Sequence, residues 1–117
     1  MRGEPGNEII RELAPSTGDT IIDKPGRGAF AHTDFEHILQ LKGVRNLVFT
    51  GVTTDVCVSS TMREANDRGF DCMLVADATA SATEELHEAA MESVNSEGGI
   101  FGCVGKVQDI IDVIGSP

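Results

Sequence analysis

A cysteine that follows a short polar turn is the clearest chemical feature of this sequence. Residues 46–50 form an apolar run typical of a buried strand, and Gly51, Thr53 and Thr54 punctuate the chain before Cys57. Small and apolar side chains then recur at the spacing of an amphipathic helix. Cys57 is therefore expected at the first turn of a helix, where free amides and the helix dipole favour an anion.

Two interpretations of Cys57 are open at this point. At a helix start the cysteine can act as a thiolate nucleophile, and the same amides can hold an oxyanion. Alternatively, Cys57 is a small buried hydrophobic residue, a common environment for cysteine. The side chain of Asp55 or Thr54 is expected to cap the amides of the helix in either case.

A lysine earlier in the chain favours the chemical interpretation. Residues 20–23 are expected to form a short strand, and Lys24 opens the glycine-rich loop of residues 24–30 directly after it. Sites in parallel sheets form beyond the carboxyl ends of the strands. Lys24 and Cys57 both follow such ends, so they can face one pocket. The alternative for Lys24 is a solvated loop lysine.

The rest of the chain alternates helices with apolar strands. We expect a helix opened by a capping box at residues 33–36, a strand at 72–76, a helix at 83–96, a strand at 99–102 and a helix at 106–114. In the helix at 83–96, capped by Thr83 or Ser81, the expected inner side chains are Leu86, Ala89, Ala90 and Val94. This alternation predicts an α/β fold with a parallel sheet and right-handed crossovers.

Composition narrows the class of protein. The 117 residues suit one domain, and nine basic against nineteen acidic residues give a net charge of −10, which argues against nucleic acid and anionic membranes as partners. No apolar run reaches the length of a membrane span. Three cysteines without a zinc-binding spacing indicate a cytoplasmic protein with free thiols and no metal. The histidines, His32, His37 and His87, are expected at the surface or within helices.

Three stretches resemble the isochorismatase-like cysteine hydrolases: residues 23–30, residues 50–58 and residues 61–70. The third looks most like the ureide-cleaving members, biuret hydrolase among them. The resemblance implies that residues 1–117 form a single isochorismatase-like domain. Its fold would be a doubly wound, mostly parallel sheet with helices on both faces, Rossmann-like and three-layered.

The resemblance also assigns roles to individual residues. It implies that Cys57 is the nucleophile, that Lys24 is the cation beside it, and that the amides of Thr53 and Cys57 form an oxyanion hole after a cis peptide bond. It implies Phe30 and Glu97 as substrate-binding residues. Cys57 would attack the carbonyl of a small amide or ureide, and the resulting thioester would be hydrolysed. The resemblance implies no cofactor, and we expect a homo-oligomer.

Two departures from the family pattern matter. The family's catalytic aspartate lies on its first strand, in an N-terminal portion that this sequence does not match, so we expect a domain truncated at the N-terminus with impaired activity. Asp23 and Asp77 are expected to be structural. Glu97 replaces a glutamine that reaches the substrate in biuret-type members, and an ionised carboxylate donates no hydrogen bond.

Two alternatives to an active hydrolase remain open. One is a catalytically inactive, truncated paralogue that associates with a full-length subunit. The other is a thiol redox sensor that pairs Cys57 with Cys72 or Cys103.

Overall fold

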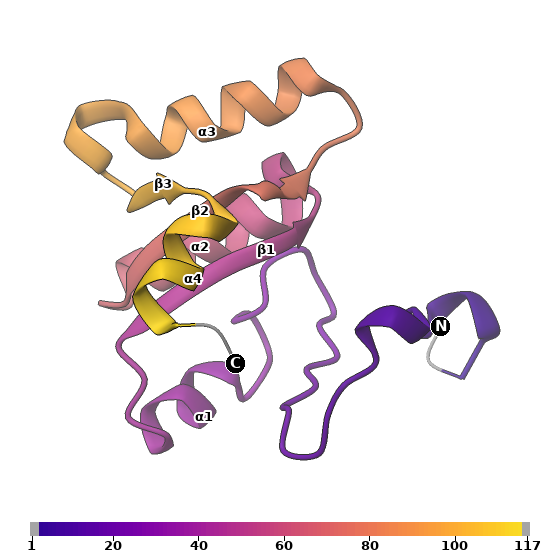
Figure 1. The fold of residues 1–117 in the computed structure, drawn as a ribbon. Coiled ribbons are helices and arrows are strands. Elements are labelled where there is room, and N and C mark those ends of the chain that lie inside the picture. Colours follow the sequence, from indigo (N-terminus) through magenta and orange to yellow (C-terminus); the bar gives the residue numbers. More distant parts are fainter. Residues whose placement is uncertain (1–2, 116–117) are drawn as a thin grey trace.

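A parallel sheet of three strands organises the fold in the computed structural model, which describes residues 3–115 (Figure 1). The strands are β1 (Asn46–Val52), β2 (Asp71–Ala80) and β3 (Cys103–Gly105), in the order β1-β2-β3. The helices are α1 (Phe35–Leu41), α2 (Ser59–Asp67), α3 (Glu84–Gly99) and α4 (Val107–Ile114), and two short 3₁₀ turns, Pro5–Asn7 and Arg11–Leu13, lie near the N-terminus. The predicted α/β class and the parallel sheet are confirmed.

The central strand β2 is covered on both faces. Cys72 and Leu74 belong to the buried apolar cluster that contains Met62 of α2, and the Cys72 thiol points at the Met62 carbonyl, 3.9 Å away. Successive side chains of a strand point to opposite faces. Accordingly Met73 lies on the other side, in an apolar groove with Ile110 of α4. The prediction of helices on both faces of the sheet is therefore confirmed.

The predicted strand at residues 20–23 is wrong. The chain there is extended but joins no sheet within residues 3–115, and the Ile21 side chain is 59% exposed. A strand is stabilised by a hydrogen-bonded neighbour, and apolar alternation alone cannot supply one. In the described part of the chain, β1 pairs with β2 and its other edge has no strand beside it.

The last strand is also displaced from its predicted position. Residues 99–102 make a turn, and β3 begins at Cys103, immediately past the end of the predicted strand. Gly102 explains the shift, because its φ of 132° suits glycine and not an L side chain. A Cβ atom at this position would lie 2.3 Å from the Cys72 carbonyl oxygen. The glycine therefore allows the chain to turn tightly against the start of β2.

Helix α3 begins as predicted, and of its predicted inner side chains Val94 is buried and Ala90 half-buried. The Thr83 hydroxyl caps it by accepting a hydrogen bond of 3.2 Å from the Leu86 amide. Leu86 is exposed, so its predicted inward position is wrong, and Ala89 is exposed too. The buried side chains are His87 and Val94, which are seven residues apart on one helical stripe.

Side-chain hydrogen bonds at the start of α1 differ from the prediction. The capping box predicted at residues 33–36 does not form, because Asp34 is the N-cap and makes no side-chain cap bond. The Thr33 hydroxyl instead donates to the Ala29 carbonyl and accepts from the Phe35 amide at 3.3 Å. It therefore fastens the end of the glycine-rich loop to the start of α1.

Within residues 3–115, no helix combines the length and the apolar character that crossing a bilayer requires.

We expect the chain to self-associate through the open edge of β1. Val48 and Val52 on this strand are 52% and 71% exposed, and an uncovered apolar strand edge is a template for pairing. Light scattering over a concentration series should show oligomers, and Val52→Lys should shift the distribution toward monomer. Leu86→Lys, at an exposed apolar site on α3, should leave it unchanged. A stable wild-type monomer at high concentration would refute the expectation.

We expect stability to fall at alkaline pH because of Cys72. Burial, with smaller contributions from the charges of Asp71 and Cys103, raises the pKa of Cys72 from 9.0 to about 11. The folded protein therefore holds this proton when the unfolded chain has lost it, so the stabilisation is present below pH 9 and is lost as the pH rises toward 11. Denaturant titrations should show a decline of up to about 2–3 kcal/mol from this group.

The matched variants for this measurement are Cys72→Val and Cys103→Ser. The first should flatten the alkaline decline, because it removes the buried thiol while keeping an apolar side chain. The second should keep most of the decline, because Cys103 is exposed. An equal decline in all three proteins would assign the effect to other groups.

Candidate active site

The turn that follows β1 carries the candidate nucleophile. The Val52–Thr53 peptide bond is cis, as predicted. A single π-helical turn, Thr54–Val58, follows it and runs directly into α2. Cys57 lies in this turn and is partly buried, so its predicted place at the start of a helix is confirmed.

Lys24 reaches the candidate nucleophile from the glycine-rich loop. Its Nζ atom lies 3.5 Å from the Cys57 Sγ atom and also donates a hydrogen bond of 3.2 Å to the Gly26 carbonyl. The structure therefore brings together the two residues that the sequence placed at one pocket. An ammonium group at this distance can stabilise negative charge on the sulfur by direct contact.

Lys24 and Cys57 line a shared cavity of about 340 Å³. The other lining residues are Ala29, Phe35, Leu47, Val48, Phe49, Thr50, Val52, Val58 and Thr61. Within the described residues, Lys24 is thus the one charged side chain of the lining, and no carboxylate contributes to it. The cavity can hold a small molecule against the cysteine, with a mostly apolar wall and a single cation.

The amides around Cys57 are arranged in part by the turn itself. The amides of Val56 and Val58 both donate to the Thr53 carbonyl, at 3.3 and 3.1 Å. These two donors therefore point back into the turn. The pair assigned by resemblance, the amides of Thr53 and Cys57, stays a prediction.

The two predicted substrate-binding residues do not line this cavity. Phe30 is 4% exposed and belongs to the apolar core. Glu97 is exposed and lies where α3 leaves helical geometry. The nearby Ile100 carbonyl accepts a hydrogen bond of 3.1 Å from Asn66, near the C-terminal end of α2, whereas Cys57 precedes the N-terminus of that helix.

A buried polar contact on the far side of the turn escaped the sequence analysis. The Thr54 hydroxyl and His87 Nδ1 are 2.7 Å apart, and both residues are buried. His87 Nε2 lies 3.1 Å from the Ala76 carbonyl, which can only accept, so Nε2 carries a proton and donates it to that carbonyl. Thr54 therefore binds α3 and does not cap its own helix. The predicted alternative, a cap bond from the Asp55 side chain, does not form either.

The signal for this contact was present in the sequence. His87 and Val94 are seven residues apart, so they fall on one face of a helix capped at Thr83. His87 lies within α3, one of its two expected positions, and this spacing further indicates that it is buried.

Asp77, inside β2, has a structural role. Asp77 accepts a hydrogen bond of 2.9 Å from the Val107 amide and so fixes the start of α4. Across residues 3–115, no three side chains among His, Cys, Asp and Glu cluster closely enough to hold a metal ion.

The arrangement of the cysteines disfavours the redox alternative. Cys72 is paired with Leu47 near the beginning of β1, whereas Cys57 follows the other end of that strand. The intervening strand length is roughly 15 Å, at about 3.3 Å per residue, and a disulfide requires Cα atoms within about 7 Å. Cys103 is paired with Met73 at the same distant end.

A parallel α/β domain with a lysine-paired cysteine beyond the carboxyl end of a strand defines a class of candidate thiol hydrolases. The sequence matches the isochorismatase domain over residues 1–107. The chain therefore belongs to the isochorismatase family.

Individual relatives agree with this assignment. The chain is 36% identical to a ureidoacrylate amidohydrolase, RutB, of Methylobacterium radiotolerans over 110 residues, which is 93% of this chain and 42% of the relative. It is 38% identical to RutB of Azorhizobium caulinodans over 102 residues, 86% of this chain and 44% of the relative. The chain thus spans less than half the length of these curated relatives.

Solved structures share the fold as well. An isochorismatase-like hydrolase from Alkaliphilus metalliredigens superposes with a TM-score of 0.90 at 35% identity, covering 97% of this chain and 61% of that one. A cysteine hydrolase from Pseudomonas syringae pv. phaseolicola gives a TM-score of 0.90 at 26% identity, covering 97% and 57%.

We predict that Cys57 is the most reactive of the three thiols at neutral pH. Lys24 and the helix start favour its thiolate, whereas Cys72 is buried with a pKa of about 11 and remains protonated. Iodoacetamide labelling followed by peptide mapping measures the three rates. Cys103 is the internal control, because it is exposed. Faster labelling of Cys72 or Cys103 would contradict the prediction.

Proposed function

We propose that this chain carries the nucleophile half of a cysteine hydrolase that cleaves a C–N bond of a small amide or ureide. The observation that carries the proposal is the 3.5 Å contact between Lys24 and Cys57 inside a cavity of small-molecule size. Membership in the isochorismatase family and the relatives named ureidoacrylate amidohydrolase support the substrate class.

The proposed reaction has two stages. The Cys57 thiolate attacks the substrate carbonyl, and the negative charge moves to the carbonyl oxygen, where the amides of Thr53 and Cys57 would stabilise it. The C–N bond then breaks, the nitrogen leaves with a proton as ammonia or an amine, and a thioester to Cys57 remains. Water hydrolyses the thioester, which releases the acyl group as a carboxylic or carbamic acid and restores the thiol.

The proton transfers need a group that the described residues do not place in the cavity. Lys24 can stabilise the thiolate by charge, but a protonated ammonium has no lone pair with which to accept a proton. No carboxylate lines the cavity within residues 3–115. Loss of a general acid–base typically costs about 10²- to 10⁴-fold in rate.

The lack of an acid–base group among the described residues of the cavity also supports a second candidate function, that of a non-catalytic subunit. The chain covers 42% and 44% of the two amidohydrolases, and in the described residues β1 has an edge without a neighbouring strand. A non-catalytic subunit that docks on a longer relative would use the same edge. Turnover measured with and without such a relative separates the two functions.

We expect the 117-residue chain to be alkylated at Cys57 yet to hydrolyse ureidoacrylate or simple amides negligibly. Co-expression with the N-terminal portion of the Methylobacterium radiotolerans relative should raise turnover by about 10²-fold or more, because it can supply the acid–base group. Ammonia release, measured by a coupled assay, reports the reaction.

The controls for this experiment are variants at the two paired residues. Cys57→Ala should abolish turnover in the assembled protein, and Lys24→Met should lower it while leaving the fold intact. Turnover that survives Cys57→Ala would refute the proposed nucleophile. Robust hydrolysis by the chain alone would show that it contains its own acid–base group.

A further inference from the structure

The loop that carries Lys24 has no strand to hold it. Residues 20–23 join no sheet within the described part of the chain, and Lys24 is exposed. The position of its ammonium group therefore depends on how the loop of residues 24–30 is fixed to the rest of the molecule. Lys24 itself bonds to the loop through the Gly26 carbonyl.

One buried hydroxyl connects this loop to the candidate nucleophile. Thr61 of α2 is 8% exposed, and its Oγ1 atom accepts a hydrogen bond of 3.0 Å from the Ala29 amide. The same oxygen donates a hydrogen bond of 2.8 Å to the Cys57 carbonyl. One donated proton and one accepted proton suit a hydroxyl group, so both bonds form at once.

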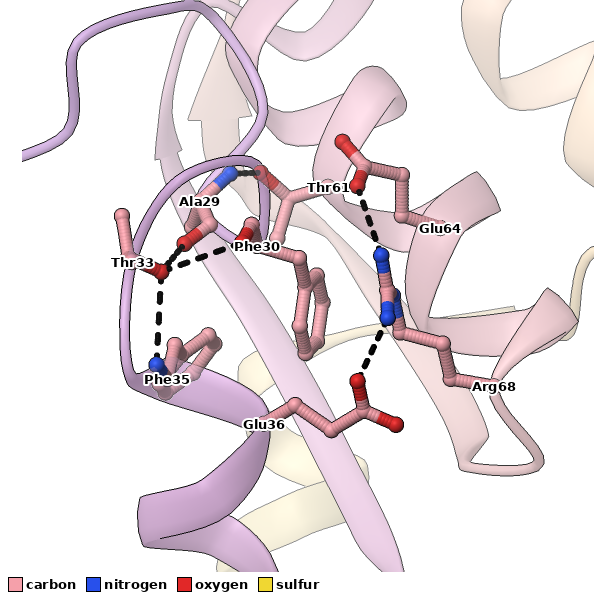
Figure 2. Close-up of polar contacts among 8 residues, drawn as sticks. All are labelled: Ala29, Phe30, Thr33, Phe35, Glu36, Thr61, Glu64 and Arg68. Carbon is pink, nitrogen blue, oxygen red and sulfur yellow. Dashed lines mark hydrogen bonds and ion pairs between the residues drawn. The ribbon is translucent and has the colours of Figure 1, made fainter.

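Figure 2 shows the Ala29–Thr61 bond of this connection beside a second set of contacts. Thr61 and Ala29 face one another, and the Phe30 ring lies next to them, between the loop and α2. Arg68 of α2 pairs with Glu36 of α1 and, at 3.7 Å, with Glu64 of its own helix. These contacts attach the loop and α1 to α2, but among them the Thr61 hydroxyl is the one that also binds the Cys57 backbone.

The close approach of loop and helix at this point has a steric requirement. Gly28 is buried, and a Cβ atom at this position would lie 2.0 Å from a carboxylate oxygen of Glu64. A larger residue at position 28 would therefore require the flexible end of the Glu64 side chain to move aside.

We propose that Thr61 is a positioning residue that fixes Lys24 beside Cys57 by joining the Ala29 amide to the Cys57 carbonyl. The inference rests on the proposed function, since it assumes that Lys24 stabilises the Cys57 thiolate. The charged group that faces Cys57 from the cavity wall is Lys24, and the helix amides add a partial positive charge from the cysteine's own element. Loss of the Thr61 hydroxyl leaves the loop free to carry Lys24 away from the thiol.

The test is the alkylation rate of Cys57 in the full chain, with iodoacetamide as the probe and peptide mapping as the readout. At neutral pH, Lys24→Met should slow alkylation by about tenfold, as expected for the loss of a charge at this distance. Thr61→Val, which keeps the shape and removes the hydroxyl, should slow it several-fold. Thr61→Ser should restore a rate close to that of the wild type.

A second pH separates positioning from simple access to the thiol. At about pH 10, above the usual pKa of about 8.5 for an accessible thiol, ionisation no longer needs Lys24. Wild type and Thr61→Val should therefore react at similar rates. Equal slowing of Thr61→Val at both pH values would overturn the inference, because it would mean that the substitution blocks access.

Thr79→Val is the matched control. Like Thr61, Thr79 is a buried threonine that donates a hydrogen bond, of 2.8 Å, to the carbonyl four residues earlier, that of Val75. Unlike Thr61, it does not line the cavity. This variant should alkylate at the wild-type rate. If Thr61→Val does not fold by circular dichroism, Thr61→Ala compared with Thr61→Ser makes the same test of the hydroxyl.

The remaining outcomes separate the inference from the proposed function. A wild-type rate in Thr61→Val, together with slow alkylation of Lys24→Met, would overturn the role of Thr61 and leave the proposed function standing. If Cys57 in the wild type reacts no faster than Cys103, and Lys24→Met has no effect, then both fail.

Discussion

The docking of a loop without secondary structure on α2 is the constraint on which the candidate site depends. The Phe30 ring anchors this loop in the core, 5.0 Å from the Phe35 ring and 6.1 Å from the Phe70 ring, with the Arg68 guanidinium 5.2 Å from its centre. Burial of a phenyl side chain contributes about 1.5–3 kcal/mol, and one hydrogen bond contributes about 1 kcal/mol. Burial of Phe30 therefore contributes most of the free energy that holds the loop on α2, and the Thr61 hydrogen bond fixes how the loop is oriented.

The electrostatics of the site are local despite the acidity of the chain. The net charge is −10, but charges in water are screened over about 8 Å at physiological ionic strength. Lys24 lies within 3.5 Å of Cys57, well inside that range, and no carboxylate among the described residues lines the cavity. Lys24 is therefore the charge in direct contact with the thiol, while Asp55 lies in the same turn and Asp23 precedes Lys24 in the chain.

The turn that bears Cys57 is held from both sides by hydroxyl groups of threonine. Thr54 binds His87 of α3, and Thr61 binds the loop, so the two helices and the loop meet around the cysteine. A buried hydroxyl without a partner is costly, and each of these has one. Because both hydroxyl groups are hydrogen-bonded, the position of the turn depends on the packing of α3 as well as on that of α2.

Local patterns in the sequence determined the elements that carry the site. An apolar run before a polar turn identified β1 and the helix start at Cys57, and a lysine after Asp23 identified the second component. These features are local, because a strand or a helix follows from the types and spacing of its own residues. The Thr83 cap and the end of α3 near Ser96 were predictable for the same reason.

Only the tertiary structure decided which of these elements meet. Residues 20–23 have the composition of a strand, yet no described strand lies beside them, and hydrogen bonding to a neighbour is not encoded locally. The resemblance assigned Phe30 and Glu97 to the substrate, but packing places Phe30 in the core and Glu97 outside the cavity lining. Periodicity identifies an element, but its buried side chains and its neighbours, and hence the composition of the site, depend on how the whole chain packs, as the exposed Leu86 of α3 shows.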